Sequence, residues 1–402
     1  MTRPLTRHKL EAVRDPAQLR RLNMERVLAA AIERDVPFTR SELIDVTGLS
    51  APTVGSLAAH LIRLGLLTDL GAGPSRGGRR PARMEFNARH GFVGAIDLGS
   101  TRTHLGVADL RGELLARRTV ETARDEAPER LLEGLANQLL DLLRDIDVPV
   151  ARVLAVGAGA PGAVDPTRGM VVALVPNLAQ WHEVPVAAIL RTAISAPVVV
   201  ENDVNLAVLG EHWKGAARGH SSCAFLSFGT GIGAGILLND QLHHGHRFLA
   251  GEIGLMCMGP QYVDTDFGAR GCLETLAGLG ALRKRWQPEH QPAARWAADL
   301  FAAADRGDAA ARETAADLVT FLGIATANVS SLFDPSMVVL GGALVAEAPV
   351  IVERVRGIVG RILPAPPEIV ASSLATDAPL WGALLLAIGE ARHRVREQLA
   401  RR

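Results

Sequence analysis

Apolar positions in the first ninety residues follow a helical spacing and then give way to short strand-like runs. From residue 17 to residue 34 the apolar positions fit a helix better than strict alternation: Leu19, Leu22, Val27, Leu28 and Ile32. A second, short helix is predicted from a cap at Ser41 to Val46, and a tight turn at Gly48 then leads to a third helix capped by Ser50. Two short helices joined by a glycine turn indicate a helix-turn-helix.

The third helix is predicted to bury one apolar stripe and to end at Gly65. Two strands are expected next, at residues 66–69 and 82–86. The segment between them is rich in glycine and arginine, which is typical of a flexible basic wing. The order of these elements predicts a winged helix.

The remaining three hundred residues read as an α/β protein built from two related halves. An apolar strand that starts at Phe92 is followed by a hairpin and by a helical segment at residues 129–143. A similar start recurs at residues 223–235, about 130 residues later, as expected of two related lobes. A cleft between such lobes is the natural ligand site. A closing helix is expected at residues 380–395.

Length and composition indicate a globular protein of more than one domain. The chain has 402 residues, of which 48% are hydrophobic and 21% charged, and this composition excludes a disordered chain. Three cysteines cannot form a disulfide framework. No apolar run reaches the ~18 residues of a membrane span, and the first residues lack the apolar stretch of a signal peptide. We therefore expect a cytoplasmic protein without membrane contact.

The zero net charge hides an uneven distribution. Residues 1–90 carry 15 Lys or Arg against 9 Asp or Glu, so this part is basic and the rest is acidic by the same amount. We predict a DNA-binding domain at residues 1–88 and a ligand-binding domain at residues 89–402. In the first domain, one set of residues is expected to contact base edges and phosphates: Ser50, Thr53, Ser56, Arg76, Arg79 and Arg80. The alternative is a winged helix that contacts only protein.

Several short motifs of the second domain resemble those of the ROK family (repressors, open reading frames, sugar kinases). They lie at residues 97–101, 159–162, 201–205, 229–233, 251–254 and 271–274. With the winged helix in front, the chain resembles the transcriptional regulators of this family more than its free-standing kinases. The resemblance implies a two-lobed fold of the actin and hexokinase type, related to ribonuclease H, and a homodimer or tetramer.

The resemblance assigns sugar contacts to four polar residues, which are Asn202, Asp203, Glu252 and Glu274. Carboxylates and an amide supply the acceptors and donors that adjacent hydroxyls need. In the kinases of the family, the residue matching Asp203 is the base that takes the proton of the sugar hydroxyl. The alternative for residues 201–203 is a strand-end turn that caps the following helix.

Nucleotide binding is implied by glycine turns and one acidic residue, namely Asp97, Gly99, Thr101, Gly229, Thr230, Gly231, Gly341 and Gly342. Ser100 departs from the kinases, which have a second glycine there. If that position needs a positive φ, serine costs ~1 to 2 kcal/mol and weakens the binding of ATP and magnesium. The glycines could instead serve only the close packing of backbone segments.

A structural zinc ion is not expected, because the family's ligand positions hold the wrong residue types. They read Leu255, Thr265, Phe267 and Cys272, and one thiol does not make a tetrahedral site. The missing histidine at position 255 also removes an expected sugar contact. His243, His244 and His246 are metal-competent by type, but their place in a hairpin predicts a surface cluster.

The leading hypothesis is a DNA-binding transcriptional regulator of carbohydrate-metabolism genes, and specifically a repressor. It would bind a double-stranded DNA operator and respond to a sugar or sugar derivative, with no cofactor. An ATP-dependent sugar kinase that has kept a DNA-binding domain is the first alternative. A ligand-independent DNA binder with a vestigial cleft is the second.

Overall fold

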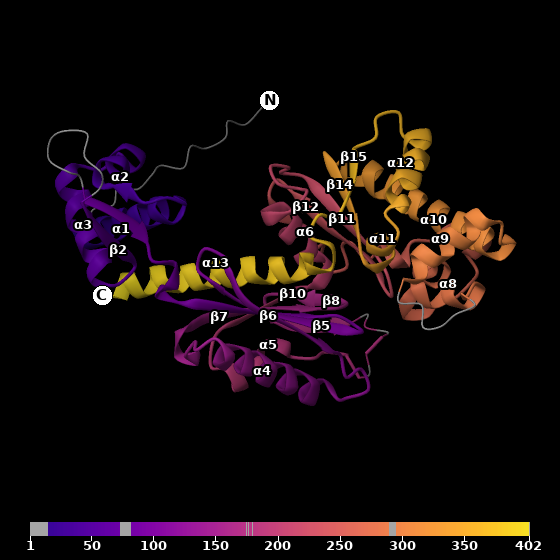
Figure 1. Ribbon diagram of the computed structural model, residues 1–402, viewed down its shortest axis with the longest axis horizontal. Helices are drawn as coiled ribbons and strands as arrows, with labels where there is room; N and C mark the ends of the chain where they lie inside the picture. Colours follow the sequence, from indigo (N-terminus) through magenta and orange to yellow (C-terminus); the bar gives the residue numbers. More distant parts are fainter. Residues whose placement is uncertain are drawn as a thin grey trace, which may run out of the picture. The chain divides into compact units, whose positions relative to one another are not determined.

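The computed structural model describes residues 15–72, 82–173, 175, 177–178, 180–288 and 295–401 (Figure 1). The chain forms two compact units. One unit combines Met1–Gly91 with the short segment Asp109–Arg111 and the end of the chain, Ala391–Arg402, and the other comprises Phe92–Ala108 and Gly112–Glu390.

The first unit is a winged helix, as predicted. Its elements are α1 (Pro16–Ile32), β1 (Phe38–Thr39), α2 (Arg40–Thr47), α3 (Ala51–Arg63), β2 (Leu67–Ala72) and β3 (Ala82–Phe86). β3 pairs with both other strands in antiparallel fashion, in the order β1-β3-β2. The two-residue strand β1 was not predicted, since a strand this short leaves no alternation in the sequence.

The helix caps of this unit match the sequence prediction in one case and differ in the other. Ser50 caps α3, and its side chain accepts the N–H of Thr53 at 3.4 Å. The predicted cap of α2 at Ser41 is wrong, because the cap is Thr39. Thr39 forms a reciprocal capping box with Glu42, whose carboxylate accepts the N–H of Thr39 at 2.6 Å. That spacing of Thr and Glu was the signal in the sequence.

The second unit contains two five-stranded sheets with the same strand order, which confirms the two-lobed α/β prediction. The first sheet consists of β4 (Phe92–Leu98), β5 (Arg102–Asp109), β6 (Leu114–Glu121), β7 (Val153–Ala160) and β10 (Val198–Asn202). The second consists of β11 (Cys223–Phe228), β12 (Ile232–Leu238), β13 (Gln241–Leu242), β14 (Met337–Gly341) and β15 (Glu368–Ala371). The orders are β6-β5-β4-β7-β10 and β13-β12-β11-β14-β15, so each sheet places three consecutive strands beside two parallel ones.

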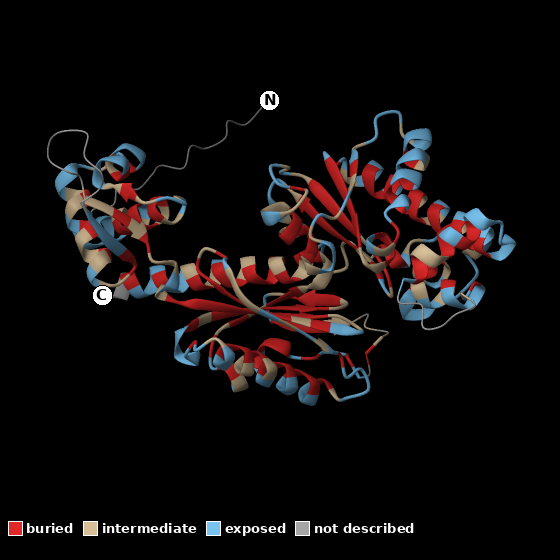
Figure 2. Ribbon diagram, viewed as in Figure 1, coloured by how far each residue is buried: buried red, intermediate tan, exposed pale blue. Residues whose placement is uncertain are grey.

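Helices cover both sheets, and buried apolar residues line the contacts between helices and sheets (Figures 1 and 2). They are α4 (Pro128–Asp145), α5 (Val186–Ile194), α6 (Asp203–Lys214), α7 (Cys272–Ala277), α8 (Leu279–Arg285), α9 (Trp296–Arg306), α10 (Ala309–Phe333), α11 (Ala343–Glu347), α12 (Val350–Ile362) and α13 (Ala378–Arg401). Short connecting elements are β8 (Ala163–Asp165), β9 (Met170–Ala173), η1 (Ala88–His90), η2 (Val150–Arg152), η3 (Ile253–Leu255), η4 (Pro260–Tyr262), η5 (Gly268–Arg270) and η6 (Ala375–Asp377).

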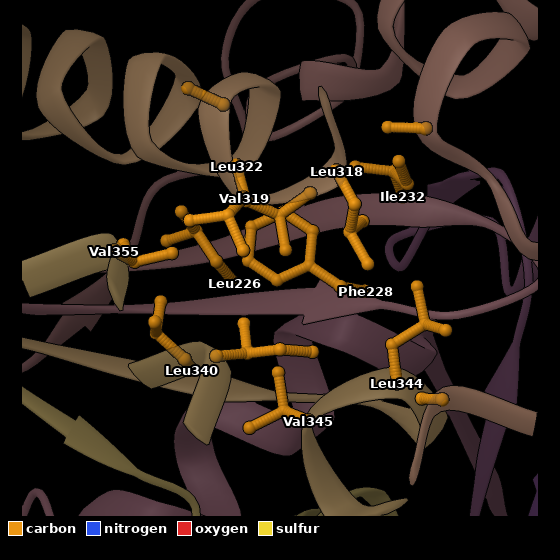
Figure 3. Packing of buried hydrophobic residues seen from close by; sticks show 14 of the residues in the cluster. Leu226, Phe228, Ile232, Leu318, Val319, Leu322, Leu340, Leu344, Val345 and Val355 are labelled. Carbon is orange, nitrogen blue, oxygen red and sulfur yellow. The ribbon is translucent and has the colours of Figure 1, made fainter. Parts of the chain in front are cut away.

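Within the described ranges, α10 is the one helix long and apolar enough to cross a membrane by length and composition, and half of that stretch is buried in the protein. Figure 3 shows why it is apolar. Leu318 and Leu322 of α10 reach the side chains of Leu226 and Phe228 on β11, in the same core as Val355 of α12. Packing against the second sheet accounts for the composition of α10, since a buried helix needs apolar residues on most of its surface.

The first half of α13 packs against its neighbours through backbone contacts that leave no room for a side chain. A Cβ added at Gly382 would lie 2.0 Å from the carbonyl oxygen of Leu206 in α6. A Cβ at Gly157 of β7 would lie 2.0 Å from the carbonyl oxygen of Ala383. These glycines let α13 lie directly on α6 and on the first sheet.

We expect Gly382→Ala to lower the free energy of unfolding by about 1 to 3 kcal/mol, because the added methyl forces α13 away from α6. Gly389→Ala in the same helix is the matched control, since nothing lies within 4 Å of the Cβ that it adds. The control should be neutral or stabilise by up to about 1 kcal/mol through helix propensity. Urea unfolding of both variants measures the difference, and equal effects would contradict the contact.

Candidate functional site

A cavity of about 260 Å³ lies in the second unit, and segments from both sheets line it. The first sheet contributes residues 99–101 after β4 and residues 202–205, where β10 ends and α6 begins. The second contributes residues 229–234 at the turn from β11 into β12, together with the loop residues 250–252. Glu274 of α7 completes the lining on that side. The four residues predicted to contact a sugar therefore surround one cavity, together with the two glycine turns.

Asn202 and Asp203 stand where β10 ends and α6 begins. The Asn202 side chain caps α6, because its Oδ1 accepts the N–H groups of Val204 and Asn205 at 2.9 and 3.0 Å. Its Nδ2 donates to the carbonyl oxygen of Gly162 at 3.0 Å. The capping interpretation of this turn thus holds for Asn202, which also lines the cavity. Burial raises the pKa of Asp203 to about 6.

Two glutamates face Asp203 from the second sheet's side of the cavity. Burial is the main cause that raises the pKa of Glu252 to about 7, and the nearby carboxylates of Asp203 and Glu274 add to it. Burial also raises the pKa of Glu274, whose Oε2 accepts the N–H of Ile232 at 3.0 Å. Three carboxylates in one small cavity form a set of acceptors for several adjacent hydroxyl groups.

Cations are scarce around these carboxylates. Among the described residues that line the cavity there is no lysine, arginine or histidine. Arg270, on η5, is exposed; its guanidinium lies 3.5 Å from Oδ1 of Asn177 and lowers the pKa of Glu274. The cavity therefore favours a ligand without negative charge.

The first glycine turn accepts serine without strain. Ser100 lies outside the positive-φ region in which serine would be costly, so the expected penalty of ~1 to 2 kcal/mol does not apply. Gly99 is the residue that must be small, because a Cβ there would lie 2.5 Å from the carbonyl oxygen of Arg102. Thr101 lines the cavity next to Ser100. Close packing inside the turn therefore explains the glycine at position 99.

The other predicted nucleotide residues divide into two groups. Gly229, Thr230 and Gly231 line the cavity. Gly341 and Gly342 lie outside the cavity lining. A Cβ at Gly341 would lie 2.2 Å from the Phe225 ring, and a Cβ at Gly342 would lie 2.5 Å from the Phe228 carbonyl oxygen. Close packing therefore explains both glycines. Asp97 is 4% exposed and lies behind the lining; burial holds its pKa well above its usual range, with Asp203 and Asp377 adding to the shift.

The residues at the family's zinc positions do not fit a zinc ion. Leu255 is 41% exposed, and Thr265 and Phe267 supply no strong zinc donor. Cys272 is buried, and its Sγ accepts the N–H of Met258 at 3.4 Å. In the part of the chain that the structure describes, no group of three or more metal-binding side chains comes together.

The predicted surface cluster of histidines is wrong for one of its members. His243 and His246 are exposed. The Nε2 of His244 lies 2.7 Å from Oε2 of Glu201, and the His244 side chain is only 29% exposed. No sequence pattern indicates this pair, because 43 residues separate its members and only the meeting of the two sheets brings them together.

The predicted DNA-contacting residues that the structure describes are the N-cap of α3 and two residues of the helix itself. Ser50 and Thr53 share a hydrogen bond between their hydroxyl groups at 2.8 Å, in the first turn of the helix. Ser56 is exposed one turn further along. Arg76, Arg79 and Arg80 lie outside the described residues.

The second unit is a duplicated α/β fold with carboxylates and glycine turns around one cavity, and the first unit is a winged helix, a fold of DNA-binding domains. The family model described as "ROK family" matches residues 93–390. The chain belongs to the ROK family.

Three relatives show which branch of the family is similar along the whole chain. A xylose repressor of Bacillus subtilis is 26% identical over 374 residues, covering 92% of this chain and 96% of its own. A glucokinase of Thermotoga maritima is 32% identical but covers only 72% of this chain and 94% of its own. A crystal structure of a ROK family transcriptional regulator, a homolog of the E. coli MLC protein, covers 96% of this chain and all of its own, with a TM-score of 0.76 and 22% identity. The whole-length similarity is thus to regulators, as expected from the sequence.

Proposed function

We propose that this protein is a sugar-responsive transcriptional repressor that binds a DNA operator through its winged helix and a sugar in the carboxylate-lined cavity. One observation carries the proposal, namely that a winged helix and a sugar-kinase-like cavity occur in one chain. The whole-length similarity to a xylose repressor supports it. Homodimers or tetramers would place two winged helices on one operator, as is common for such DNA-binding proteins.

The coupling between sugar and DNA needs to be only modest. A free-energy coupling of ~1 to 3 kcal/mol changes operator affinity by roughly 5- to 150-fold, which is enough to control a gene. The deciding experiment measures binding of the purified protein to DNA from upstream of its own and neighbouring genes, at fixed salt, with and without D-xylose, D-glucose and other sugars. Specific binding that one sugar shifts supports the proposal, and operator affinity that no sugar changes would refute the sugar response.

The cavity's charge narrows the class of effector. We expect an uncharged sugar to bind at least tenfold more tightly than its phosphate ester, because a phosphate would approach three carboxylates with no lining cation among the described residues to offset the repulsion. Calorimetry with D-xylose and D-glucose against xylose 5-phosphate and glucose 6-phosphate tests this. The variant Arg270→Ala tests the contribution of the nearby Arg270 cation. Tight phosphate binding that this change abolishes would place the phosphate at Arg270 and overturn the expectation.

A sugar kinase is the second candidate, and the intact glycine turns and Asp203 favour it. Asp203 would take the proton of the attacking sugar hydroxyl, and Asp97 would lie near a magnesium ion bound with the nucleotide. An assay for ADP release with a panel of sugars tests this activity. Turnover that survives Asp203→Asn would exclude Asp203 as the base.

A further inference from the structure

The cavity is bounded by segments of two different sheets, and one side-chain pair outside the cavity lining joins them. His244 belongs to the loop that follows β13 in the second sheet, and Glu201 belongs to β10 in the first. Their side chains meet at 2.7 Å. Glu201 directly precedes Asn202, and the loop that contains His244 continues to Glu252. Each member of the pair is therefore connected through a short stretch of chain to a residue that lines the cavity.

On the first-sheet side, Glu201 holds the turn that carries Asn202. Its carboxylate is almost completely buried, with the residue 3% exposed. Oε1 accepts the backbone N–H of Asn202 at 2.8 Å and the Nδ2 group of Asn205 at 3.0 Å, while Oε2 faces His244. One carboxylate thus fixes both the turn and the loop opposite. A buried carboxylate needs such partners, because it has lost its hydration.

On the second-sheet side, His244 closes the loop that ends at Glu252. Its carbonyl oxygen accepts the N–H of Ala250 at 3.2 Å, and its ring lies edge-on to the Phe248 ring at 6.5 Å. Gly251 adopts a φ of 90°, and a Cβ there would lie 1.9 Å from the carbonyl oxygen of Ala234. The loop is therefore anchored to β12 at its far end and to Glu201 at its near end.

We propose that His244 and Glu201 form a positioning pair that holds the Glu252 loop against the Asn202–Asp203 turn, so that carboxylates from both sheets can bind one sugar molecule. The sugar is taken from the proposed function, whereas the pair itself is a property of the sugar-free protein. The hydrogen bond to Glu201 raises the pKa of His244, so the imidazolium form of this contact is favoured. Neither residue lines the cavity, and both act through their neighbours.

Hydrogen exchange of the sugar-free protein tests the loop anchor. In His244→Ala, we expect amides of residues 245–252 to exchange about tenfold faster at pH 6, while those of α10 stay unchanged. His244→Arg, which restores a cation facing Glu201, should recover most of the protection. All variants are compared at one pH, because Glu252 on the loop and Asp203 opposite it also titrate near neutrality. Unchanged loop exchange in His244→Ala would overturn the proposal.

The matched control is a second histidine and carboxylate pair in the same unit. His212 Nε2 lies 3.2 Å from Oδ1 of Asp240, and neither residue lines the cavity. His212→Ala should leave the exchange of residues 245–252 unchanged. NMR titration gives an independent signature, since the His244 pKa should fall in Glu201→Gln. An unchanged His244 pKa in Glu201→Gln would also contradict the proposed pairing of His244 with Glu201.

Sugar affinity is the final measurement, with D-xylose and D-glucose as probes. We expect about tenfold weaker binding in His244→Ala, recovery in His244→Arg and no change in His212→Ala. If the wild-type protein binds neither probe, the proposed function loses its ligand, but the exchange and NMR measurements still decide whether the pair holds the loop. Wild-type affinity retained by His244→Ala would overturn the positioning role.

Discussion

Replacing Asp203 by asparagine is expected to weaken sugar binding by about 10- to 150-fold and, in the same variant, to stabilise the sugar-free protein. The loss of affinity follows from removing a charged hydrogen-bond acceptor, which contributes about 1.5 to 3 kcal/mol. Calorimetry with the effector measures this part. Operator affinity in the absence of sugar should stay within about twofold of the wild-type value, because Asp203 lines the cavity of the second unit and is not part of the winged helix.

The gain in stability follows from the pKa of Asp203. Burial raises this pKa from 3.8 to about 6, so the folded protein holds a proton that the unfolded chain releases. Stability is therefore lost as the pH rises through about 6, and asparagine removes that loss. We expect a gain on the order of 3 kcal/mol at pH 7.5 that disappears below about pH 4.

Urea unfolding at pH 7.5 and at about pH 4 tests this expectation. The control is Asp264→Ala, which changes an exposed carboxylate. The control should change neither stability nor sugar affinity. A lower free energy of unfolding for Asp203→Asn at pH 7.5 would contradict this expectation, because it would show that the carboxylate stabilises the sugar-free protein.

Local patterns in the sequence were enough to predict the winged helix and the duplicated α/β organisation, whereas the fold of the actin and hexokinase type was implied by the resemblance to the ROK family. The spacing of Val54, Leu57 and Leu61 defines the buried face of α3, and all three are at most 2% exposed. The repeat of an apolar strand at residues 92–98 and again at 223–228 predicts the duplication, which the matching strand orders of the two sheets confirm. These features depend on residues close in sequence, so periodicity reveals them.

The features that the sequence did not reveal depend on where distant segments meet. The environment of His244 is set by Glu201 on another sheet, and no pattern in residues 243–246 encodes it. The backbone conformation of Ser100 depends on how its turn packs, and a comparison of residue types alone overstated the cost of serine there. In the same way, Gly341 and Gly342 match a family motif, but the nearby Phe225 and Phe228 explain them by packing.

The operator contacts predict a large change in salt dependence when two wing arginines are removed together. Each phosphate contact contributes about 0.9 to the slope of log K against log salt concentration, so Arg79→Ala with Arg80→Ala should reduce the slope by about 1.8. Affinity for the operator and for unrelated DNA should fall together, because phosphate contacts carry no sequence information. Titrations of labelled operator at several salt concentrations measure both quantities.

The matched control removes the same charge from the other unit. Arg124→Ala with Arg130→Ala changes two exposed arginines of the ligand-binding unit, so it alters the net charge equally without touching the winged helix. If both double variants reduce the slope equally, net charge explains the effect and the wing makes no direct phosphate contact. A reduced slope for the wing variant alone, with its sugar affinity intact, would assign DNA binding to the winged helix and sugar binding to the second unit as separate functions of one chain.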